Sequence, residues 1–159
     1  MNSSPNRASP PTEKAKRNAA NLDLKTAHRM LPLVRSIVSD IVHTAEQLNT
    51  LVPEQATLDE YRRSLTWTSR ERRYALHDAI ATAEKSIHGA VRELDTLGVA
   101  LVDTRKGLVD FPTKINGRPA AYSWHLGEDA VDFWRYAGEE QRRPIPAEWQ
   151  QASRGSSGP

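Results

Sequence analysis

The chain has 159 residues, of which 26% are charged and 38% are hydrophobic, and its formal net charge is only +2. This length allows one domain with a thin core, and the small net charge gives no general attraction to nucleic acid or membranes. The absence of cysteine excludes disulfides, a catalytic thiol and metal sites built on cysteine, and it fits a reducing cytoplasm.

Both ends of the chain are predicted to be disordered. Residues 1–20 are rich in Ser, Pro, Asn and Ala, and residues 151–159 are rich in Ser and Gly, so neither has much to bury. An organellar transit peptide is the weaker interpretation of the basic residues near the start. No stretch approaches the roughly 20 apolar residues of a membrane-spanning helix. We therefore expect a cytoplasmic protein with one folded domain over 22–150, made of a helical hairpin (22–98) and a β-rich unit (99–150).

The first predicted helix has an N-cap at Asp23, whose side chain can accept hydrogen bonds from the first free N–H groups. Its apolar residues are spaced alternately by three and four, which is typical of a helix packed on another helix. Pro32 predicts either a kink or the first turn of a new helix, and Pro53 predicts the end. The main helix is therefore predicted over 32–51. Its apolar positions are Val34, Ile37, Ile41, Ala45, Leu48 and Leu51.

A second long helix is predicted over 69–97. Thr-x-x-Glu segments at 57–60 and 68–71 have the spacing of capping boxes, and they predict a short linking helix over 57–65 and the start of the long one. Gly98 stands where a left-handed C-cap is needed. Two helices joined in this way predict an antiparallel hairpin with a coiled-coil-like seam. The second helix contributes Leu76, Ile80, Ala83, Ile87, Ala90, Leu94 and Leu97 to this seam.

Beyond Gly98 the pattern changes to short apolar runs at 99–102, 108–111 and 120–124, separated by turn residues that include Asn116-Gly117. The runs predict a three-stranded antiparallel β-meander, which is too small to be stable alone and must pack on the helices. Acidic residues at 128–129 predict the start of a short C-terminal helix that ends near Tyr136. The predicted fold class is therefore α+β, mainly α.

Four segments form a recognisable combination: LPLVR at 31–35, GLVDFP at 107–112, WHLGE at 124–128 and RPI at 143–145. Together they resemble a bacterial family catalogued as domain of unknown function 2203, and the segments at 65–74 and 145–149 resemble its planctomycete-like branch. The resemblance implies no activity, because none is assigned to the family. Arg135 stands where members often have a histidine, and Ser123 stands where some have a cysteine. This implies that any metal binding or chemistry at those positions is lost here.

The β-rich unit contains the candidate site residues. A histidine with nearby carboxylates is the combination that binds a divalent metal or acts as acid and base, and aromatic side chains line many small-molecule pockets. The competing interpretation is structural, with the carboxylates starting a helix and the aromatic residues forming the core. The spacing matches no established ligand motif, so no cofactor is predicted. The candidates for ligand or metal binding are Asp110, Trp124, His125, Glu128, Asp132, Trp134 and Arg143.

A basic run near the tip of the hairpin gives a different hypothesis. Arginines interleaved with Tyr61, Trp67 and Tyr74 are typical of a surface that binds single-stranded nucleic acid. The glutamates at 60 and 71 interrupt the charge, and solvated charge is normal at such a tip, so nucleic acid is not the favoured partner. The candidate residues are Arg62, Arg63, Arg70, Arg72 and Arg73.

The hairpin itself gives the favoured functional hypothesis. Two helices leave one apolar flank uncovered, and a second copy would bury it. We therefore expect a non-enzymatic interaction or scaffold protein that acts as a helical homodimer. The alternatives are a small-molecule or divalent-metal-binding protein, with its site in the β-rich unit and possible enzymatic activity, and a nucleic-acid-binding protein.

Overall fold

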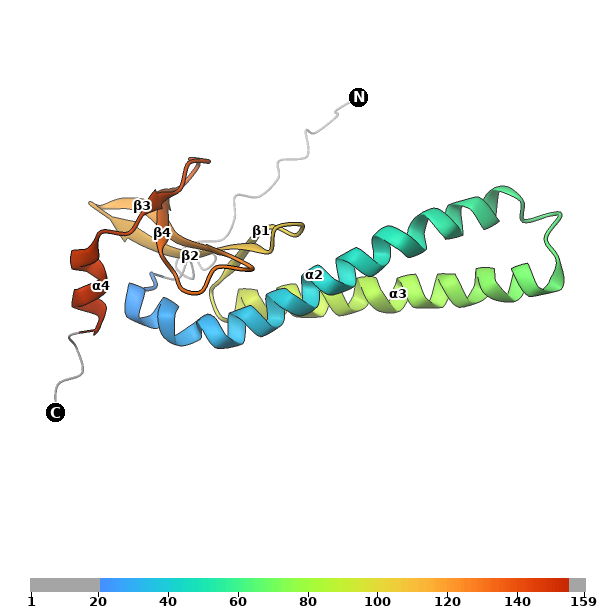
Figure 1. The fold of residues 1–159 in the computed structure, drawn as a ribbon, viewed down its shortest axis with the longest axis horizontal. Coiled ribbons are helices and arrows are strands. Elements are labelled where there is room, and N and C mark those ends of the chain that lie inside the picture. The colour runs from blue at the N-terminus through green and yellow to red at the C-terminus, as the bar shows by residue number, and fades with distance from the viewer. Residues whose placement is uncertain (1–20, 155–159) are drawn as a thin grey trace, which may run out of the picture.

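The computed structural model describes residues 21–154, and it has two long helices, a five-stranded sheet and a short final helix, in that order (Figure 1). The tails predicted at 1–20 and at 155–159 lie outside the described residues. Residues 151–154, which the sequence assigns to the C-terminal tail, form the end of helix α4 (Ala147–Arg154). The α+β class and the helical hairpin are confirmed.

Helix α2 (Leu24–Glu60) is continuous over 37 residues. Asp23 is its N-cap, as predicted, and accepts a 2.7 Å hydrogen bond from the backbone N–H of Thr26. Hydrogen bonding by Thr26 lowers the pKa of the Asp23 carboxyl group. The predicted boundaries at 32 and 51 are wrong, because both Pro32 and Pro53 lie inside the helix. Each proline removes one hydrogen bond, and the helical turns on either side and their packing outweigh that local cost.

Helix α3 (Trp67–Thr96) starts two residues earlier than predicted. Thr66, rather than Thr68, is the N-cap, and its side chain accepts a hydrogen bond from the backbone N–H of Ser69. The prediction of a separate linking helix over 57–65 is also wrong, because α2 runs to residue 60 and only a short turn follows it. The C-cap prediction is confirmed: Gly98 has φ +78°, and the N–H of Val99 donates to the Leu94 carbonyl over 2.9 Å.

The two helices lie side by side as an antiparallel pair, and the sheet covers only one end of them (Figure 1). We call residues 42–86 the tip half of the hairpin. No residue of α2 from Val42 to Glu60 is buried, although α3 buries Leu76, Ile80 and Ala83 there. At the other end, α2 buries seven apolar side chains. The packing in the tip half is therefore incomplete.

The sheet has five antiparallel strands in the order β1-β2-β3-β4-β5, whereas the sequence predicts three. The prediction of a short helix that ends near Tyr136 is also wrong, because residues 133–136 pair with β3 as a strand. Their aromatic side chains favour a strand on a half-buried surface over a short isolated helix. The strands are β1 (Ala100–Asp103), β2 (Leu108–Ile115), β3 (Arg118–His125), β4 (Phe133–Tyr136) and β5 (Arg143–Pro144).

One face of the sheet packs on the N-terminal part of α2 and forms the main core. Phe111 and Trp124 are completely buried, and they belong to one cluster with Val34, Val38 and Ile41 of α2. Helix α4 closes the open end of this core, where Trp149 packs against Trp134 with 5.5 Å between ring centroids. We call the opposite face of the sheet, which α2 does not cover, the outer face.

Candidate functional site

The strand register sorts the candidate residues between the two faces of the sheet. Paired residues of antiparallel strands share a face, and neighbours along a strand alternate. Val109 pairs with Trp124 on the core face, so Asp110 and its partner Ser123 point to the outer face. Ser123 is the only fully buried polar side chain in the described chain, although it lies outside the main apolar cluster. Something polar must therefore cover it.

Arg142 provides this cover. It lies in the segment between β4 and β5, and its Nε donates to the Ser123 hydroxyl over 2.9 Å. Its Nη2 donates to the Ser123 carbonyl at 3.0 Å and to Glu128 Oε1 at 2.5 Å. The guanidinium also lies 4.4 Å from the ring centroid of Phe133. The Arg142 and Glu128 side chains are 20% and 14% exposed, so this pair is well shielded from water. We call Ser123, Glu128 and Arg142 the arginine clamp.

A second shielded ion pair lies beside the clamp. Arg135 Nη2 is 2.5 Å from Asp110 Oδ2, and its Nε donates to Oδ1 over 3.3 Å. Its Nη1 donates to the Glu139 carbonyl at 2.6 Å. Both charged side chains are 16% exposed. This bidentate arrangement uses the planar geometry of arginine, so a histidine at position 135 could not replace it.

His125 lies at the edge of the clamp. Its backbone N–H donates to Glu128 Oε1 over 2.8 Å, and its ring Nδ1 is 2.9 Å from the Leu126 carbonyl. Because a carbonyl oxygen only accepts, Nδ1 carries the proton, and Nε2 faces the Glu128 carboxylate at 3.8 Å. The histidine side chain is 40% exposed. Glu128 therefore holds two elements in place, the end of β3 and the segment that carries Arg142.

The other candidates lie apart from this cluster. Trp124 is buried in the core, where its indole N–H donates to the Glu128 carbonyl over 2.9 Å. Trp134 also faces the core side, between Tyr136 and Trp149. The exposed Asp132 contacts Gln150 of α4. Arg143 pairs with Glu139 at 3.2 Å near the surface.

The structure brings Asp110, Glu128 and His125 onto one side of the β-rich unit, without Asp132. Arg135 engages both carboxylate oxygens of Asp110, and Arg142 engages Oε1 of Glu128, so most of the oxygens that a metal would need already have a cationic partner. Over residues 21–154 no group of three or more His, Asp or Glu side chains is arranged to hold a metal ion. The residues that sequence reasoning left out of the candidate set are Ser123, Arg135 and Arg142, and these organise the outer face.

The arginines of the nucleic-acid hypothesis divide into two groups. Arg72 binds Glu54 through two hydrogen bonds of 2.8 and 2.9 Å, and Arg73 pairs with Asp59 at 2.5 Å, so both join α3 to α2. The Asp59 carboxyl group has a lowered pKa because Arg73 hydrogen-bonds to it. Arg62, Arg63 and Arg70 are exposed and make no ion pair within the described part of the chain.

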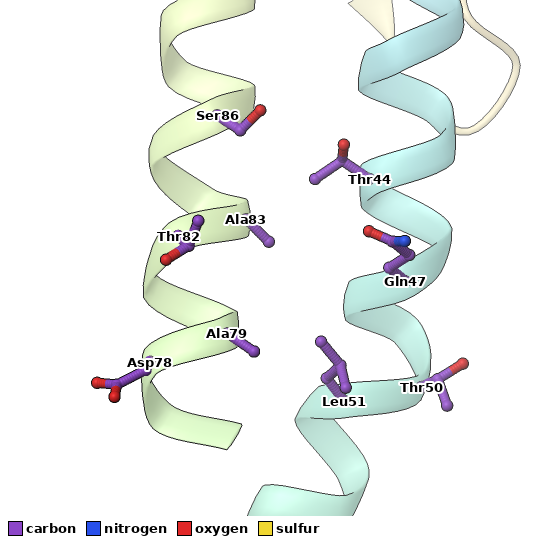
Figure 2. Close-up of a pocket in the computed structure, with 9 residues that line it drawn as sticks. All are labelled: Thr44, Gln47, Thr50, Leu51, Asp78, Ala79, Thr82, Ala83 and Ser86. Atoms are coloured by element: carbon purple, nitrogen blue, oxygen red, sulfur yellow. The ribbon is translucent and has the colours of Figure 1, made fainter. Parts of the chain in front are cut away.

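A groove runs between the helices in the tip half, with a volume of about 750 Å³ (Figure 2). Leu51 of α2 and Ala79 and Ala83 of α3 point toward one another across it. One leucine facing two alanines does not fill the space between the helices, and this explains why no side chain of α2 is buried there. The full lining is Thr44, Gln47, Thr50, Leu51, Asp78, Ala79, Thr82, Ala83 and Ser86.

Comparison with known proteins finds a family rather than an activity. A model of the family described as "Uncharacterized conserved protein (DUF2203)" matches residues 22–145. No curated protein and no solved structure matches the chain. None of the helices in the described range is long and apolar enough to span a bilayer.

Proposed function

Because the chain belongs to the DUF2203 family of uncharacterised conserved proteins, we propose its function from its own surfaces: a non-enzymatic interaction or scaffold protein that acts as a helical homodimer. The groove of the tip half carries this proposal. A second hairpin laid over the groove would bury the half-exposed Leu51 and the exposed Ala79, and it would complete a four-helix bundle.

The exposed apolar side chains support an interface in this region. Within residues 21–154 six large apolar side chains are exposed, and four of them lie in the tip half: Val52, Tyr61, Trp67 and Tyr74. Trp67 alone is 72% exposed. A strip about 45 Å long and two helices wide offers on the order of 900 Å² per protomer, which is the size of a standard stable interface.

The charges favour an antiparallel arrangement of the two hairpins. Residues 36–60 contain five acidic residues and no lysine or arginine, whereas residues 61–73 contain five arginines and one glutamate. A parallel dimer would bring together the exposed arginines of the two tips that make no ion pair in the described residues, Arg62, Arg63 and Arg70, and like charges repel. An antiparallel dimer centred on the groove would place Arg70 about 18 Å from the centre, level with Glu93 and Asp95 of the second copy.

The test introduces a charge at the centre of the groove. Ala79→Glu keeps a good helix former at an exposed position, so the monomer should fold, but the twofold would bring two carboxylates together. We expect the dissociation constant of the dimer to rise about 100-fold, which corresponds to roughly 3 kcal/mol. Sedimentation equilibrium over a range of concentrations measures this change.

Ala81→Glu is the matched control. It makes the same substitution at an exposed position of α3 that does not line the groove, so the dimer should persist. Higher salt should weaken the wild-type dimer because the interface pairs opposite charges. A wild-type protein that stays monomeric at tens of micromolar, or an equal response of both variants, would refute the proposed interface.

A further inference from the structure

We propose that a pocket on the outer face of the sheet, beside the Asp110–Arg135 pair, binds a small organic acid that has one carboxylate on a compact apolar body. The pocket has a volume of about 520 Å³, which is within the range of small-molecule sites. It is separate from the hairpin groove, and the proposal does not depend on the dimer.

The walls of the pocket are small and rigid. They include Ala100 of β1, Pro112 of β2, Pro119 and Ala121 of β3, and Ala137 after β4. Alanine and proline have no side-chain rotamers to restrict, so these walls are preformed and lose little entropy when a ligand binds. They present methyl groups and pyrrolidine rings to the cavity, which suits a single ring or a branched aliphatic group.

The charged groups of the lining favour an anion. Asp110 is neutralised by Arg135, and Lys114 makes no ion pair within residues 21–154. Arg135 uses three N–H groups in its bonds to Asp110 and the Glu139 carbonyl. A guanidinium has five N–H donors, so two remain for a ligand. A cationic ligand would be repelled by the positive charge of Lys114.

The same charges favour one carboxylate over a phosphate. A planar carboxylate matches the two free N–H donors of a guanidinium and the charge of one lysine. A phosphate dianion would carry a second charge close to Asp110, and it would leave the alanine and proline walls without an apolar group to contact. The apolar body therefore supplies contact area, and the carboxylate supplies orientation.

The experiment is isothermal titration of the full chain with three acids (benzoate, cyclohexanecarboxylate and isobutyrate), each compared with its neutral amide and with inorganic phosphate. At least one acid should bind, and its amide should bind at least about tenfold more weakly, because it has lost the charge. In NMR spectra of the protein, the chemical shifts of the backbone N–H groups of Ala100, Lys114 and Ala121 should change when the acid binds. Failure of all three acids, equal binding of acid and amide, or binding of phosphate alone would overturn the proposal.

Two exposed variants and one control locate the site. Lys114→Ala should weaken the binding of the acid by about fivefold, as expected for a partly exposed ion pair, and leave the amide unchanged. Ala100→Leu should fill the mouth of the pocket and abolish binding of the acid. Lys106→Ala removes a lysine from the exposed β1–β2 turn, outside the pocket, and should have no effect. An acid that binds Ala100→Leu as well as the wild type would contradict this location.

Discussion

Replacement of Gly107 by alanine is expected to lower the free energy of unfolding by about 3 kcal/mol. Gly107 has φ +62°, a left-handed conformation that costs a residue with a Cβ about 1 kcal/mol. The added Cβ would lie 2.8 Å from Val38 Cγ1 and 2.9 Å from Leu126 Cβ. Both contacts are too short, so the turn between β1 and β2 would have to move away from α2.

Gly117→Ala separates the backbone cost from the packing cost. Gly117 has φ +74°, but an added Cβ would meet nothing within 4 Å. Its expected cost is therefore only the backbone strain, about 1 kcal/mol. Urea unfolding of both variants, followed by circular dichroism, measures the difference. If both variants lost the same free energy of unfolding, the close contact of Gly107 with α2 would make no contribution to stability.

Arg142→Met is expected to cost about 3 kcal/mol of folding stability, because it leaves the shielded Glu128 carboxylate without its cation and Ser123 without its donor. The loss should be largest in the C-terminal segment, since Arg142 fastens that segment to β3. Amide hydrogen exchange should therefore increase first over residues 137–146.

The adjacent arginine provides the control for this prediction. Arg143→Met removes an ion pair whose side chains are 42% and 36% exposed, and such a pair contributes at most about 1 kcal/mol. Adding Glu128→Gln to Arg142→Met should recover part of the lost stability, because the unpaired charge is then gone. If the stability loss of the double variant equalled the sum of the losses of the two single variants, Arg142 and Glu128 would not be energetically coupled.

Local signals in the sequence predict much of the hairpin. Asp23 and Gly98 are correctly placed as caps because capping depends only on the neighbouring turn. The prolines mislead because their local cost is real but smaller than the packing of a long helix. Strand β4 is missed because residues 133–136 become a strand only by pairing with β3, and the acidic residues before them look like a helix start.

The organisation of the candidate site is harder to predict. Asp110 and Arg135 are 25 residues apart, and Ser123 and Arg142 are 19 apart, with no fixed spacing to relate them. The outer face of β2 and β3 can be anticipated from the alternation around Phe111 and Trp124. The arginines that cover this face depend on how the segment after β4 folds back, and no local pattern encodes that path.

The central claim, an antiparallel helical dimer, is tested most directly by one distance between the two hairpins. The chain has no cysteine, so Thr68→Cys at the exposed start of α3 carries a single spin label. Position 68 lies 14 residues from the groove centre near residue 82, so the two labels should be about 40 Å apart. Double electron–electron resonance should show this separation. A distance below about 20 Å, which places the two tips together, or the absence of dipolar coupling would contradict the antiparallel dimer.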